Sequence, residues 1–178
     1  MRKIAIFDMD GTLVDTDEAN AAAYHVAIGQ TGIGKALSFY GRVTSSVVRD
    51  VLGGSYSDGV DEVERIKIEE YSRQLWRARL GKAAEAFKCV ILNQHLFEKV
   101  VLLSDGKDRR VMETLRHHGL VGCFDEIVCN GGRGDKYANY FNNYDSDPAA
   151  CVVWENEDGQ IKSAIAAGVR NENIRKVG

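Results

Sequence analysis

Hydrophobic and polar positions follow two different periods along the chain. Residues 3–7 form a short apolar run that ends in acidic residues, which predicts a buried strand. Between residues 15 and 92, apolar residues such as Ile68, Tyr71 and Leu75 recur at the spacing of one helix face. From residue 100 onward, short apolar runs alternate with helical stretches. This alternation is typical of a parallel sheet whose strands are connected by helices.

Capping residues and glycines set the expected element boundaries. Asp15, Thr16 and Asp17 predict the start of a helix that continues to residue 28, where a glycine-containing stretch ends it. Three further helices are expected at residues 43–52, 61–80 and 82–92. In the second half, we expect strands at residues 100–104, 126–129, 151–155 and 174–177, and helices at residues 109–117, 137–141 and 160–167.

The first strand is separated from the other strands by the helical stretch. It must join their sheet across that stretch to be buried on both faces. The pattern therefore predicts the α/β class, with a Rossmann-like parallel core formed by residues 1–14 and 93–178. An all-α cap at residues 15–92 is expected to interrupt this core.

Composition narrows the classes of protein to consider. The chain of 178 residues is 44% hydrophobic and 28% charged, which is ordinary for a globular protein with a sizeable core. Its net charge of −3 gives no electrostatic reason to expect nucleic acid or an anionic membrane as a partner. No apolar run approaches the ~20 residues that a membrane-spanning helix needs.

Cysteine usage bears on the compartment. The four cysteines form no Cys-x-x-Cys pair and lie in or beside apolar segments, so we expect reduced thiols rather than disulfides or zinc ligands. The cytoplasm is the expected location, and the protein is expected to be a monomer or a homodimer.

Two acidic residues follow the first strand directly. Residues two apart on a strand share a face, so Asp8 and Asp10 can converge on one cation and one reacting group if the backbone bends at Gly11. Open α/β sheets bind ligands at the carboxyl ends of their strands. Gly11 and Thr12 add main-chain N–H groups at the same place, where an anion can sit. These residues are therefore the first candidates for a functional site.

Residues 8–12, Asp-Met-Asp-Gly-Thr, resemble the first motif of the haloacid dehalogenase-like (HAD) hydrolase superfamily. The later motifs of that family have counterparts in the right order. A strand ends at Ser104 and is followed by Asp105, Lys136 comes about thirty residues later, and Glu155 and Asn156 end a further strand. The subgroup resembled contains β-phosphoglucomutase and phosphoglycolate phosphatase, which have a small helical cap.

The resemblance implies a role for each matching residue. Asp8 would attack phosphorus and form an aspartyl-phosphate, and Asp10 would first protonate the leaving oxygen and then activate water. Ser104 would hydrogen-bond a phosphoryl oxygen, and Lys136 would pair with both the phosphate and Asp8. Asp105 is a further candidate for contact with the substrate.

The resemblance also implies a Mg²⁺ cofactor bound by oxygen ligands. Asp8, the main-chain carbonyl of Asp10, and an acidic residue of the fourth motif would supply these ligands, with Glu155 as the first candidate. Asn156 stands where the subgroup usually has a carboxylate, and it could coordinate through its amide oxygen or hold a metal-bound water. Glu157 and Asp158 remain alternatives for the missing charge.

Substrate choice is expected to lie in the cap, because the core recognises only the phosphoryl group. Arg42 falls where related enzymes place a substrate-contacting turn, and it could bind an anionic or hydroxyl-rich leaving group. A surface arginine with no such role is an equally good interpretation.

The function expected from the resemblance is a Mg²⁺-dependent phosphatase acting on a small phosphorylated metabolite. Asp10 argues against dehalogenation, because the dehalogenases of the family lack this aspartate. A sugar-phosphate mutase of the β-phosphoglucomutase type is an alternative, although Asn20 stands where those mutases carry a histidine. A binding or regulatory protein with weakened catalysis is a second alternative, and Asn156 is the residue that suggests it.

Overall fold

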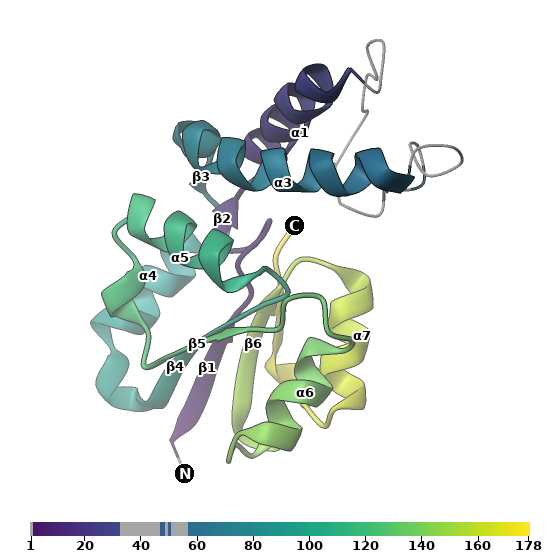
Figure 1. Cartoon of the computed structure of the whole chain (residues 1–178). Helices are drawn as coiled ribbons and strands as arrows, with labels where there is room; N and C mark the ends of the chain where they lie inside the picture. Colours follow the sequence, from purple (N-terminus) through teal and green to yellow (C-terminus); the bar gives the residue numbers. More distant parts are fainter. Residues whose placement is uncertain (1, 33–46, 49, 51–56) are drawn as a thin grey trace. The chain divides into compact units, whose positions relative to one another are not determined.

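The computed structural model describes residues 2–32, 47, 48, 50 and 57–178 (Figure 1). The chain divides into two compact units. The larger unit contains Met1–Asp15 and Leu80–Gly178, and the smaller one contains Thr16–Arg79. Short strands β2 (Val14–Asp15) and β3 (Arg79–Leu80) pair where the chain passes between the units.

The larger unit is built on a five-stranded sheet with the strand order β5-β4-β1-β6-β7. All pairings in this sheet are parallel, which confirms the expected α/β class. The first strand lies at the centre, where its apolar residues 4–7 are buried on both faces of the sheet. The strands are β1 (Lys3–Phe7), β4 (Phe97–Ser104), β5 (Glu126–Cys129), β6 (Cys151–Glu155) and β7 (Ile174–Lys176).

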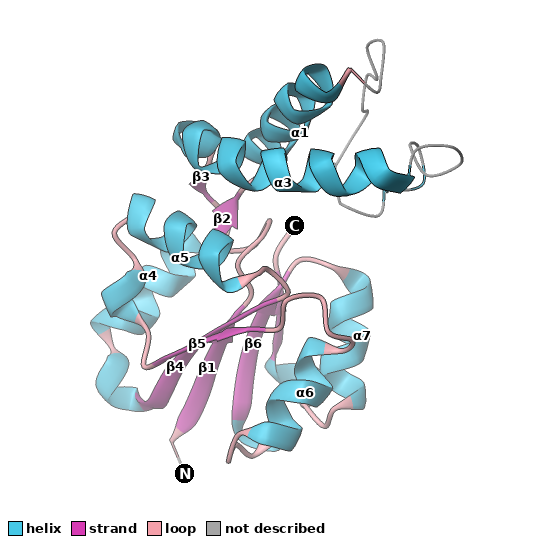
Figure 2. Ribbon diagram, viewed as in Figure 1, coloured by secondary structure: helices cyan, strands magenta, loops and turns pink. Residues whose placement is uncertain are grey.

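Helices cover both faces of the sheet, as Figure 2 shows. Ile4 and Ile6 of β1 join a core that includes Tyr137 and Tyr140 of α6. On the opposite face, the ring of Phe7 packs edge-on against Phe87 of α4, with 5.1 Å between centroids. Side chains that alternate along β1 thus pack against helices on opposite faces of the sheet. These helices are α4 (Ala84–Leu92), α5 (Asp108–His117), α6 (Lys136–Asn143) and α7 (Asp158–Ala166).

The strand register brings the functional candidates to one edge of the sheet. Phe7, the last residue of β1, pairs with Leu102 of β4 and with Trp154 of β6. Asp8 therefore leaves the sheet close to the ends of both neighbouring strands, at Ser104 and Glu155.

Helix α4 belongs to the larger unit, although the sequence pattern placed residues 80–92 in the cap. Phe87 stacks on Phe124 at 4.9 Å in addition to its contact with Phe7. The chain before α4 is also tied to the first loop, because Ala83 N donates to Thr12 O at 3.0 Å. The division of the chain thus falls after residue 79 rather than after residue 92.

The smaller unit contains two long helices, α1 (Asp17–Thr31) and α3 (Ser57–Gln74), which pack against each other. Its core includes Tyr24, Ile28 and Val63, and the Tyr24 hydroxyl donates to Glu64 at 2.9 Å. Helix α3 ends at Gln74 and a 3₁₀ turn at Leu75–Arg77 follows, so the helix expected to reach residue 80 is shorter.

Two expectations for the cap concern residues outside the described part of the chain. Most of the helix expected at residues 43–52 lies outside the described residues, as does Arg42.

Within the described part of the chain, no helix is both long and apolar enough to cross a membrane.

Candidate active site

The loop that follows β1 fixes the first acidic residues. The main-chain oxygen of Met9 accepts hydrogen bonds from the N–H groups of Thr12, Leu13 and Val14 at 3.3, 3.0 and 2.9 Å. Gly11 has φ +79°, and a Cβ there would lie 2.4 Å from the side-chain amide of Asn156. Only glycine suits both the backbone angle and this close approach.

The same loop uses the N–H groups that were expected to face an anion. Gly11 N donates to Val14 O at 2.8 Å, and Thr12 N donates to Met9 O. These two groups hold the loop together and are not presented to a ligand. The expectation that an anion can sit on these N–H groups is therefore not supported by the geometry.

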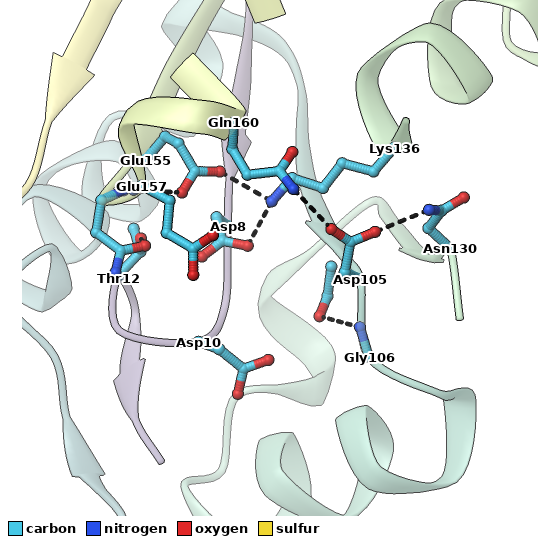
Figure 3. Close-up of polar contacts among 12 residues, drawn as sticks. Asp8, Asp10, Thr12, Asp105, Gly106, Asn130, Lys136, Glu155, Glu157 and Gln160 are labelled. Atoms are coloured by element: carbon cyan, nitrogen blue, oxygen red, sulfur yellow. Dashed lines mark hydrogen bonds and ion pairs between the residues drawn. The ribbon is translucent and has the colours of Figure 1, made fainter. Parts of the chain in front are cut away.

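Lys136 joins two strand ends inside the larger unit (Figure 3). Its ammonium lies 2.6 Å from Asp8 Oδ1 and 2.8 Å from Glu155 Oε2, and its side chain is only 2% exposed. The ammonium is delivered by the first residue of α6, whose N-cap is Asp135. Asp135 Oδ1 accepts from Tyr137 N at 2.9 Å and from Ala138 N at 3.0 Å, which satisfies two main-chain donors of the helix start.

The buried cluster holds two carboxylates and one ammonium. Burial opposes the charge of Lys136, but Asp8 and Glu155 outweigh it and raise its pKa. Burial raises the pKa of Asp8 to about 7, against the lowering effect of Lys136 and with a further increase from Glu155. One cation therefore does not compensate both carboxylates, and the cluster favours the approach of further positive charge.

Glu155 has a different position from the one expected of a metal ligand. Its Oε2 accepts from Lys136 and from the Tyr137 hydroxyl at 3.0 Å, and its Oε1 accepts from Asn156 N and Glu157 N at 2.9 and 3.1 Å. Both oxygens are thus engaged by donors of the protein itself. The structure makes Glu155 the partner of Lys136 and the anchor of the turn before α7.

Ser104 and Asp105 end β4 beside this cluster. Ser104 is fully buried, and its Oγ accepts from Gly106 N at 3.0 Å. Asp105 was expected to contact substrate, but amides hold both of its oxygens. Asn130 Nδ2 donates to one at 2.8 Å and Gln160 Nε2 to the other at 2.9 Å. Asp105 therefore ties the end of β4 to the loop after β5 and to α7.

Asp10 lies apart from the contact between Asp8 and Lys136, as Figure 3 shows. Its partner is Arg110, in the first turn of α5. The guanidinium donates to both carboxylate oxygens, from Nη1 to Oδ1 at 2.7 Å and from Nη2 to Oδ2. This is the two-point geometry that arginine offers to carboxylates.

Asn156 lies against the loop after β1. With its nitrogen turned toward them, its amide donates to Thr12 Oγ1 at 3.0 Å, Glu155 Oε1 at 3.1 Å and the main-chain oxygen of Asp10 at 3.3 Å. Asp158, one of the alternatives for the missing charge, is exposed and pairs with Lys176 at 2.7 Å. It does not reach the cluster.

Comparison with known proteins gives this arrangement a family. Residues 5–168 match the family model described as haloacid dehalogenase-like hydrolase. The chain belongs to this family.

One relative of known name matches nearly the whole chain. It is 23% identical over 182 residues to the fructose-1-phosphate phosphatase YqaB of Escherichia coli (strain K12), with 96% of this chain and 95% of that protein covered.

Solved structures of HAD-like proteins share the fold. CbbY from Rhodobacter sphaeroides in complex with xylulose-(1,5)bisphosphate has a TM-score of 0.76 at 17% identity, covering 96% of this chain and 84% of that chain. A predicted phosphoglycolate phosphatase from Haemophilus somnus 129PT also has a TM-score of 0.76 at 17% identity, covering 94% and 83%.

The site of this HAD-like hydrolase offers the oxygen ligands that Mg²⁺ prefers, but few of them are charged. Among the described residues, no three Asp, Glu, His or Cys side chains are grouped to hold a metal. Oxygens available to such an ion include the Asp8 carboxylate, the main-chain carbonyl of Asp10 and, if its amide turns over, Asn156. Mg²⁺ is commonly held by one or two carboxylates together with substrate phosphate and water, so this set is sufficient.

Four contributors to the site were not singled out from sequence. Tyr137 directly follows Lys136, and its hydroxyl donates to Glu155 Oε2 at 3.0 Å. Arg110, Asn130 and Gln160 belong to no motif, and their spacing from Asp10 and Asp105 along the chain carries no local signal.

Proposed function

We propose that this HAD-like hydrolase is a Mg²⁺-dependent phosphatase that works through an aspartyl-phosphate on Asp8. The observation that carries the proposal is the buried contact of Lys136 with both Asp8 and Glu155 at the carboxyl ends of adjacent strands. A lysine held 2.6 Å from a carboxylate fixes that carboxylate in place and presents positive charge to an incoming phosphoryl group.

The reaction divides into two displacements. In the first, an oxygen of Asp8 forms a bond to phosphorus while the ester P–O bond breaks, and protonated Asp10 gives its proton to the leaving oxygen. In the second, ionised Asp10 takes a proton from water. The resulting hydroxide attacks phosphorus and releases inorganic phosphate and the Asp8 carboxylate. The Ser104 hydroxyl and the Lys136 ammonium would bind phosphoryl oxygens in both steps.

The metal would be held by the Asp8 carboxylate and the Asp10 main-chain carbonyl, with the Asn156 oxygen as a neutral third ligand. When bound, Mg²⁺ neutralises charge on the transferring phosphoryl group. Glu155 would act on the reaction indirectly, because it binds Lys136 and the main-chain N–H of Asn156.

The substrate class that we propose is a small phosphorylated metabolite, such as a sugar phosphate. The named function of the Escherichia coli relative, a fructose-1-phosphate phosphatase, supports it. The helices at Thr16–Arg79 would form the cap that selects the leaving group.

One observation favours a second function, that of a binding or regulatory protein with weak catalysis. The Asn156 amide offers nitrogen donors beside the Asp10 carbonyl, where a catalytic metal would need an oxygen. The two functions differ in turnover, so one assay separates them.

The test is phosphate release from a panel of phosphate monoesters, with and without Mg²⁺. We expect Mg²⁺-dependent release that is lost in Asp8→Asn, which removes the nucleophilic charge and keeps the shape. Asp158→Asn is the matched control, because it makes the same change at an exposed aspartate that pairs with Lys176. It should retain full activity. Absence of release from the folded wild-type protein at millimolar Mg²⁺ would favour the binding protein.

A further inference from the structure

We propose that Arg110 is a positioning residue for Asp10, and that the protonation of the leaving group depends on it. This inference rests on the proposed phosphatase function and adds a residue to its machinery. It comes from the two-point contact between the Arg110 guanidinium and the Asp10 carboxylate.

The contact is sheltered and directional. The side chains of Arg110 and Asp10 are 21% and 11% exposed, so solvent competes weakly for them. Two parallel N–H···O bonds fix the plane of a carboxylate as well as its distance, which a single contact does not. The contact thus sets the plane of the Asp10 carboxyl group and the directions of its lone pairs. When Asp10 carries the proton for the first step, the protonated oxygen gives up its Arg110 N–H and the other oxygen keeps its own.

The loop after Ser104 is shaped to admit the guanidinium. A Cβ at Gly106 would lie 2.7 Å from Arg110 Nη2, 2.7 Å from Val111 Cγ2 and 3.2 Å from Ser104 Oγ. Any larger residue at this position would push Arg110 away from its observed place. This close approach is an observation independent of the ion pair, and it points to the same arrangement.

Arg110 also stands on a rigid element. It lies in the first turn of α5, and its main-chain oxygen accepts from Thr114 Oγ1 at 2.8 Å. Val111 and Leu115 of the same helix are completely buried. A side chain held on such a base can orient its partner, because little of its position is lost to motion.

The neighbouring Arg109 is an exposed arginine that pairs within its own helix and does not bind Asp10 in this way. Arg109 bonds Glu113 at 2.9 Å on the same helix, and its side chain is 63% exposed. It therefore provides a matched control one residue away.

Orientation of Asp10 matters most where the leaving group is poor. An alkoxide needs a proton as the P–O bond breaks, whereas p-nitrophenolate leaves without one. Loss of Arg110 should therefore slow the hydrolysis of alkyl phosphates far more than that of p-nitrophenyl phosphate. A merely structural role for Arg110 would slow both alike.

The experiment compares kcat/KM for p-nitrophenyl phosphate with kcat/KM for the best alkyl phosphate of the panel. For Arg110→Met, we expect the alkyl ester to lose at least about tenfold more than the aryl ester, because misplacement of a general acid typically costs on this scale. Arg110→Lys should recover part of the loss, and Arg109→Met should match the wild type on both substrates.

Equal losses on the two esters in Arg110→Met would overturn the proposal. If that variant fails to fold, the same comparison is made with Arg110→Lys, which keeps the charge but cannot form the two-point contact of a guanidinium. Failure of the phosphatase function itself looks different, because the wild type would then hydrolyse neither ester or would keep its activity in Asp8→Asn.

Discussion

At the scale of single residues, the site is governed by a mismatch between buried charges. Asp8 and Glu155 share the Lys136 ammonium, and burial raises the pKa of Asp8 to about 7. A second cation near Asp8 would relieve this mismatch, since opposite charge favours the ionised form of a carboxylate. Asn156 is the neutral residue at the position where the family motif that the sequence resembles usually has a carboxylate, so the protein supplies less charge there.

The substitution Asn156→Asp should therefore strengthen Mg²⁺ binding. A carboxylate can coordinate without the amide rotation that Asn156 requires, and one added ligand charge raises affinity by about tenfold or more. The affinity is measured by isothermal titration with Mg²⁺ in the absence of substrate.

The matched control for added charge is Asn142→Asp, an exposed asparagine on α6. It introduces the same charge away from the site and should leave the Kd unchanged. An equal Kd for Asn156→Asp and the wild type would show that residue 156 is not a ligand position.

At the scale of an element, the start of α6 determines where Lys136 lies. Asp135 caps this helix through two main-chain N–H groups, and its pKa is lowered because hydrogen bonds and the nearby Lys136 outweigh the effect of burial. Since Lys136 is the first helical residue, any fraying of the helix end displaces its ammonium from Asp8.

We expect Asp135→Ala to lower the free energy of unfolding by about 1 kcal/mol, the usual value of an N-cap. It should also lower kcat, because Lys136 is no longer held in register with Asp8. Asp147→Ala is the control, since Asp147 caps the 3₁₀ turn Pro148–Ala150 at the opposite, amino end of β6. That variant should lose stability without losing activity, as judged by urea unfolding and steady-state rates.

At the scale of the whole molecule, α4 shows how tertiary packing assigns a helix to a unit. The apolar face of α4 carries Phe87, whose ring lies between Phe7 and Phe124 of the larger unit. The helix thus covers one face of the sheet instead of belonging to the inserted helices.

We expect Phe87→Ala to lower the free energy of unfolding by about 3 kcal/mol, the range for a buried aromatic ring replaced by alanine. Leu92→Ala, on the same helix at a leucine that is 72% exposed, should change it by less than about 0.5 kcal/mol. Both values are measured by urea denaturation. Similar small losses in the two variants would place α4 outside the core.

The sequence alone determined the order of the strands along the chain, the α/β class and the main motif residues. The largely apolar runs at residues 3–7, 126–129 and 151–155 became strands with these bounds. The central strands β1 and β6 are mostly buried because helices cover both faces of the sheet, whereas the edge strand β5 is only partly buried. Asp8 directly follows β1 and Ser104 is the last residue of β4, so their place at the sheet edge is a local property. Lys136, the first residue of α6, was found instead from its order and spacing among the motifs.

The tertiary structure decided which side chains meet. Arg110 binds Asp10, which lies 100 residues earlier in the chain. Asn130 and Gln160 donate hydrogen bonds to the two oxygens of Asp105. The two oxygens of Glu155 accept hydrogen bonds from α6 and from the turn before α7. The unit to which α4 belongs was likewise settled by contacts distant in sequence. Periodicity reports how a segment is buried but not against what, so pairings between remote segments appear only when the chain has folded.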